Sequence, residues 1–171
     1  TKARKFLKKD TLIGLYYTFI YPYLNYCCIV WGSAPSESLC RLHRLQKRIL
    51  RIIHGVKRQH PSFQLFQSSK VLTVFQVYKL TLSIFGYKYH SNLLPNAFEN
   101  YFRYVSHVHQ YSTRLANQCQ YYINRARTNV GQNCVKYQAP MIWNSLPDSI
   151  TKSFTLNSFK RKIKHYLLSP I

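Results

Sequence analysis

The sequence predicts a mainly α-helical protein, a multi-helix bundle with at most one short β-hairpin. Two segments, residues 33–55 and 154–168, carry apolar residues at helical spacing with basic residues between them. Thr73 followed by Gln76 has the spacing of a capping box and opens a further apolar segment that reaches His90. The 171 residues, 46% of them apolar, suffice for one or two small cores. Extended structure is expected only around residues 119–130.

The first predicted helix lies in an uncharged stretch from Thr11 to Ser36. Asp10 is the expected N-cap, and Pro22 should kink or break the helix because it lacks a backbone donor. Five tyrosines are spread along the stretch, and Asn25 lies near its middle. Both features favour a buried core helix over a membrane span, in which aromatic residues gather at the two ends. A membrane-associated protein with a span at 11–36 remains the alternative from another class.

The segment SAPSESLCRLHRLQKRILRIIHG, residues 33–55, predicts an amphipathic helix with Pro35 in its first turn and Gly55 at the position just after its end. One arc of the helical wheel is apolar and holds Leu39, Leu42, Leu45, Ile49, Leu50, Ile52 and Ile53. The opposite arc is cationic and holds Arg41, Arg44, Lys47, Arg48 and Arg51. Because Glu37 is the only nearby acid, we expect this face to lack the ion pairs that usually support an exposed helix. The pattern favours a phosphate-binding face, with a merely solvated basic face as the alternative.

A second basic amphipathic helix is predicted near the C-terminal end of the sequence. Its expected inner stripe consists of Phe159, Ile163, Tyr166 and Leu167. Basic residues fill the remaining positions, and Lys160, Arg161 and Lys164 are candidate phosphate contacts. A break near residues 92–96 should divide the chain into a helical bundle, 1–92, and a C-terminal helical module, 93–171.

The charge balance predicts a polyanionic partner. The chain carries 25 basic and four acidic residues, and its formal net charge is +21. Self-repulsion at this charge opposes compaction unless a polyanion neutralises it. We therefore expect nucleic acid to bind through its phosphates, without strong sequence preference and with a steep dependence on salt.

Catalytic and metal sites are not expected. The four acids, Asp10, Glu37, Glu99 and Asp148, are too scattered to hold the ions of phosphoryl-transfer chemistry. His107, His109, Cys119 and Cys134 match no usual zinc spacing, and no glycine-rich phosphate loop occurs. We expect no cofactor, no metal and no small-molecule substrate. The five cysteines are odd in number and form no CxxC motif, which favours free thiols in an intracellular protein.

Five segments, in this order, resemble one known family: LYYTFIYPYLNYCCIVWGSA, LHRLQKRILRII, YKYHSNLLP, RTNVGQNCVKYQAPMIWNSLPDSI and SFKRKIKHYLL. They are similar to the C-terminal part of non-LTR (LINE-type, CR1/jockey-like) retrotransposon reverse transcriptases, and the resemblance covers nearly the whole chain. It implies a thumb and the segment after it, which hold the template–primer duplex for an RNA-directed DNA polymerase.

The paired aspartates of the family's catalytic palm are absent from this sequence. The resemblance therefore implies a fragment or decayed copy that is no enzyme on its own, located in the nucleus or cytoplasm. Its expected partners are the backbone of RNA or of an RNA–DNA hybrid and the upstream polymerase palm. The alternative within the family is a structural scaffold that docks on a missing palm and touches no nucleic acid.

Overall fold

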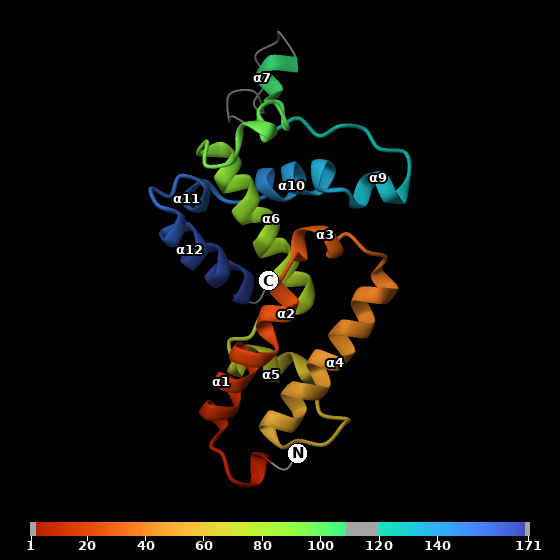
Figure 1. Cartoon of the computed structure of the whole chain (residues 1–171), viewed down its shortest axis with the longest axis vertical. Coiled ribbons are helices and arrows are strands. Elements are labelled where there is room, and N and C mark those ends of the chain that lie inside the picture. The colour runs from red at the N-terminus through yellow and green to blue at the C-terminus, as the bar shows by residue number, and fades with distance from the viewer. Residues whose placement is uncertain (1–2, 109–119, 170–171) are drawn as a thin grey trace. The chain divides into compact units, whose positions relative to one another are not determined.

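The computed structural model describes residues 3–108 and 120–169 and is mainly helical (Figure 1). These two ranges contain eleven α-helices and no β-strand, so the expected fold class is confirmed. In place of a hairpin near 119–130, the described residues there contribute one isolated antiparallel bridge, between Tyr104 and Tyr121. Residue 119 lies outside the described ranges.

The chain forms two compact units. Unit 1 comprises residues 1–78 and 167–171, and unit 2 comprises residues 79–166. The boundary lies inside one long helix, α6 (Val74–His90), whose two ends belong to different units. The domain ranges expected from the sequence, 1–92 and 93–171, divide the chain at the end of this helix instead.

Unit 1 begins with a short 3-10 helix, η1 (Ala3–Lys5), and three α-helices in place of the single one expected. They are α1 (Lys9–Phe19), α2 (Tyr21–Asn25) and α3 (Cys28–Trp31). The break expected at Pro22 is confirmed, because the proline lies in the first turn of α2, where its missing N–H costs nothing. A second break follows at Cys27, whose φ of 48° places it in the left-handed region.

Asp10 is not the N-cap of the first helix. Lys8 holds that position with no side-chain hydrogen bond, and Asp10 lies inside the first turn. A carboxylate there still faces the positive end of the helix dipole, which is favourable without a capping bond.

The uncharged stretch is only partly buried. Leu12, Tyr16, Leu24 and Cys28 face the interior, whereas several aromatic residues between them are exposed. No helix in the described part of the chain is long and apolar enough to cross a membrane. The stretch therefore packs one side of a broken helical path into the core of unit 1.

The next helices of unit 1 follow the sequence prediction closely. Helix α4 (Ser36–His54) has Pro35 at its N-cap, just before the first turn in which the sequence placed it, and ends at Gly55, whose φ of 71° lies in the left-handed region that favours glycine. Helix α5 (Ser62–Ser68) follows, and α4 packs against both α5 and α1. The capping box of α6 is confirmed: the Thr73 amide donates to Gln76 Oε1 at 2.9 Å, and the Gln76 amide donates to Thr73 Oγ1 at 3.3 Å.

A buried glutamine joins three of these elements. Gln46 on α4 is 1% exposed, and its amide nitrogen donates to the Tyr16 hydroxyl on α1 at 2.8 Å and to the Leu72 carbonyl at 2.7 Å. Its amide oxygen accepts from the Val74 N–H at the start of α6, at 3.0 Å. A buried amide without such partners would be strongly unfavourable, so the three bonds together fix this side chain.

Unit 2 contains most of α6, the 3-10 helix η2 (Asn96–Phe98) and five further helices. These are α7 (Val105–Val108), α9 (Asn129–Asn133), α10 (Val135–Asn144), α11 (Asp148–Thr151) and most of α12 (Leu156–Leu168). Trp143 packs against Gly86, where an added Cβ would lie 2.9 Å from the indole. Asn144 donates to the Tyr121 carbonyl at 2.8 Å and accepts from its amide at 3.0 Å. The Trp143–Asn144 pair therefore holds α10 against α6 and against the segment that contains Tyr121.

We expect Gln46→Leu to lower the free energy of unfolding by about 2–5 kcal/mol, since it leaves a hydroxyl, an amide and a carbonyl buried without partners. Urea denaturation measures the change. The matched control is Gln64→Leu at an exposed position of α5, which should change the stability by no more than about 0.5 kcal/mol. Equal effects of the two substitutions would show that the buried amide does not hold unit 1 together.

Candidate nucleic-acid interface

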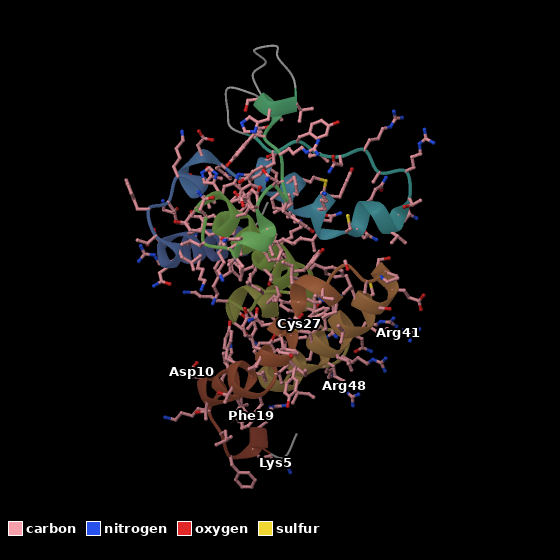
Figure 2. The ribbon with its side chains drawn as sticks, turned by 45° about the horizontal axis from the view of Figure 1, so that its top comes forward. Lys5, Asp10, Phe19, Cys27, Arg41 and Arg48 are labelled. Carbon is pink, nitrogen blue, oxygen red and sulfur yellow. The ribbon has the colours of Figure 1, made fainter. Side chains whose placement is uncertain are left out.

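The outer side of α4 presents a row of cations. Arg41, Arg44 and Arg48 are exposed, whereas Leu39, Leu50 and Ile53 on the opposite side are buried. Figure 2 shows Arg41 and Arg48 on the outer side of this helix. The three arginines recur at intervals of three and four residues, so they lie along one side of α4 over about 10 Å. We call them the α4 cationic face.

Arg51 and Lys47, which were also expected on this face, are half-buried and lie close to other residues of unit 1. Arg51 is half-buried, and its Nε and Nη2 both donate to the His60 carbonyl at 3.2 Å. This guanidinium therefore anchors the loop after α4 to the last turn of the helix. Lys47 is also half-buried and lies close enough to His43 to lower the pKa of that imidazole, in addition to the larger effect of burial.

The expectation that this face lacks helical ion pairs is wrong at its first turn. Arg41 Nη2 donates to Glu37 Oε1 at 2.9 Å, and both side chains are largely exposed. An exposed pair of this kind contributes little to stability, at most about 1 kcal/mol, and competes only weakly with a phosphate. Arg44 Nε donates a long hydrogen bond, 3.3 Å, to the Cys40 carbonyl.

The inner side of α4 differs from the expected apolar arc at two adjacent positions. Leu45 is 56% exposed, and Gln46 is buried in its place. At 100° per residue, Gln46 lies between Leu39 and Ile53 in the middle of the buried arc, and Leu45 lies near its edge. The position of Gln46 on the helical wheel therefore predicts that it is buried. Its polar side chain predicts the opposite, and for that reason it was not assigned to the apolar arc.

The C-terminal candidates form a separate surface. Lys160, Arg161 and Lys164 are exposed on the part of α12 that belongs to unit 2, opposite the fully buried Phe159 and Ile163. Tyr166 does not complete the inner stripe as expected, since it is 45% exposed. The neighbouring Lys162 donates to the Ser149 carbonyl at 2.8 Å and ties α12 to α11. We treat the α12 residues as a second candidate surface, independent of the α4 cationic face.

Additional cations gather around the C-terminal end of α4. The Arg4 guanidinium lies against Gly55, and the charge of Lys9 helps to lower the pKa of His54. Burial is the larger cause of that lowered pKa, and His54 Nε2 lies 2.6 Å from Ser69 Oγ. The negative end of the α4 dipole stabilises cations at this place. The basic character of unit 1 therefore extends from α4 to the first residues of the chain.

Acidic and metal-ligating groups are sparse in the part of the chain that the structure describes. No three His, Cys, Asp or Glu side chains come close enough there to hold a metal ion. Of the four residues considered for zinc, His109 and Cys119 lie outside the described ranges. Apart from the Glu37 carboxylate, the charged groups that α4 and α12 present to solvent are basic, and guanidinium and ammonium cations suit the binding of anions.

Comparisons with protein-family models, with curated proteins and with solved structures give no match to this chain.

Arg51 and Arg48 should differ in their effect on stability. We expect Arg51→Gln to lower the free energy of unfolding by about 1–3 kcal/mol, because the bonds to the His60 carbonyl are lost. Arg48→Gln, at an exposed position on the same helix, should change it by less than about 0.5 kcal/mol. Thermal or urea unfolding of the two variants measures both changes, and a larger loss for Arg48→Gln would reverse the roles of the two arginines.

Acid should weaken the fold. Burial, with the charges of Lys9 and His60, lowers the pKa of His54 below its ordinary 6.5. As the pH falls, the His54 imidazole is therefore protonated at a higher pH in the unfolded chain than in the folded one. Because the unfolded state binds more protons in this range, the free energy of unfolding should decrease between about pH 7.5 and pH 5.5. Urea titrations at the two pH values measure the decrease. It should become smaller in His54→Gln, and an equal decrease in that variant would exclude His54 as the cause.

Proposed function

We propose that this chain is the non-catalytic, template–primer-holding part of a non-LTR retrotransposon reverse transcriptase. The observation that carries the proposal is the α4 cationic face. Three arginines project into solvent along one side of a helix whose opposite side is buried in the core of unit 1. The ordered sequence resemblance supports the choice of family and makes the upstream polymerase palm a second partner.

Phosphate binding follows from the chemistry of this face. A guanidinium offers several N–H donors in a planar fork, which suits the oxygens of a phosphate. Arg44 and Arg48 have no acidic neighbour among the described ion pairs, which involve Glu37 and Asp148. Net charge adds long-range attraction, because unit 1 has 13 basic residues and only two acids. The face contacts the backbone of an RNA–DNA hybrid and reads no base edge.

The polymerase activity belongs to the proposed parent and not to this chain. The four acidic residues lie far apart in the sequence, and within the described residues no three His, Cys, Asp or Glu side chains come together, whereas two-metal phosphoryl transfer needs converging carboxylates. Holding the duplex requires only that the cations lie on a rigid support. The bonds of Gln46 supply this support from the inner side of α4.

Binding of a labelled RNA–DNA hybrid should fall steeply with salt. If three phosphates are neutralised, affinity should drop roughly 40-fold between about 50 and 200 mM monovalent salt, because condensed counterions are released on binding. Fluorescence anisotropy titrations with the purified chain measure the slope. An affinity that does not change over this range would exclude phosphate contact as the source of binding.

The double variant Arg44→Gln/Arg48→Gln should weaken hybrid binding at least 10-fold, since each lost charge-assisted contact is worth about 1 kcal/mol or more. It should also reduce the salt slope by about 2. The matched control is Lys70→Gln/Lys79→Gln, which removes the same charge from exposed positions outside α4. Equal losses in the two variants would show that net charge, and not the α4 cationic face, attracts the hybrid.

A further inference from the structure

A row of exposed aromatic rings follows the path from α1 to α3. Phe19, Tyr23 and Tyr26 are 65%, 83% and 77% exposed, and Val30 extends the row at 70%. They follow one another at intervals of four, three and four residues along the broken path of α1, α2 and α3, whose helices are interrupted at Ile20 and at Tyr26–Cys27. We call the four residues the aromatic strip. Large apolar side chains left in water over so short a segment mark an interaction site.

The strip is not needed for the core of unit 1. The other tyrosines of the segment already contribute to the core, and Tyr16 is 1% exposed. The ring centroid of Tyr17 lies 5.4 Å from that of Tyr16 and 5.5 Å from that of Tyr21. Burial raises the pKa of Tyr16 to about 12. Among the described residues, no ring contact involves Phe19, Tyr23 or Tyr26. The segment thus divides its aromatic residues between an inner and an outer set.

The backbone beneath the strip is fixed. The Tyr26 amide donates to the Pro22 carbonyl at 2.8 Å, and the Tyr26 carbonyl accepts from Trp31 Nε1 at 2.7 Å. Leu24, between the two exposed tyrosines, is buried in the core of unit 1. The rings therefore project from a support that a ligand does not have to order, which reduces the entropic cost of binding.

We propose that the aromatic strip stacks the unpaired bases of single-stranded nucleic acid. This inference rests on the proposed function and extends it, because a paired hybrid offers phosphates but no free base faces. Exposed rings on a cationic protein are the usual means of binding single strands without sequence preference, since every base has a π-face. The strip itself carries no charge, and the cations of η1 and α4 lie before and after it in unit 1.

Two other occupants fit the strip less well. A second copy of the chain would bring together two proteins of charge +21. The four side chains also offer roughly 500 Å², whereas a stable dimer needs about 800 Å² from each partner. An anionic membrane surface favours a helix with cations beside its apolar face, but residues 11–36 carry no charge at all.

The test compares two labelled probes of equal length: a short single-stranded oligonucleotide and one built from abasic sugars, which keeps the phosphates and lacks the bases. The wild-type chain should bind the complete strand roughly 10- to 100-fold more tightly than the abasic strand. Tyr23→Ala/Tyr26→Ala should remove this preference and leave abasic binding unchanged, whereas Tyr23→Phe/Tyr26→Phe should keep it. Phe63→Ala/Phe154→Ala, which removes two exposed rings outside the strip, is the matched control.

Each outcome separates the two proposals. Equal binding of the complete and abasic strands by the wild type would overturn stacking and leave phosphate binding intact. Failure to bind either strand or the hybrid would overturn the proposed function. If the tyrosine-to-alanine pair instead abolishes dimerisation measured by light scattering, or co-sedimentation with phosphatidylserine vesicles, the strip belongs to a second copy or a membrane. An equal loss in the control pair would also overturn the assignment to the strip.

Discussion

The hydrogen bonds of Gln46 determine which side of α4 faces solvent. The amide is buried beside Leu50 and Ile53 and is bonded to Tyr16, to the Leu72 carbonyl and to the Val74 amide. Rotation of α4 about its axis would break these bonds and bury a guanidinium without a partner, and each change is strongly unfavourable. The outward position of the arginines is therefore a consequence of the core.

The sequence predicted the end of α4 and the start of α6, because each depends on residues that are close together in the chain. Gly55 ends α4 through a backbone conformation that glycine favours, and Thr73 and Gln76 exchange bonds within a single turn. The burial of Gln46 could not be predicted from polarity, because its partners lie 26 to 30 residues away in the chain. The break at Cys27 was likewise missed, because cysteine gives no sequence signal for a left-handed residue.

In the candidate interface, too, the sequence predicted local features and missed contacts between residues distant in the chain. The wheel correctly placed Arg41, Arg44 and Arg48 away from the core, because 3.6-residue periodicity determines which side of a helix a residue occupies. It could not show that Arg51 binds the His60 carbonyl, since that acceptor belongs to the following loop. The sequence does not show which tyrosines are buried, because an aromatic ring with a hydroxyl can lie in a core or at a surface. Only the structure separates the inner from the outer set.

The most direct test of the central claim is arginine-specific chemical footprinting with mass spectrometry, with and without bound RNA–DNA hybrid. If α4 holds the hybrid, binding should protect Arg41, Arg44 and Arg48 from modification. The reactivity of Arg51 should change little, because its guanidinium is already bonded to the His60 carbonyl. If the three exposed arginines stay fully reactive while the hybrid is bound, α4 is not the surface that holds it.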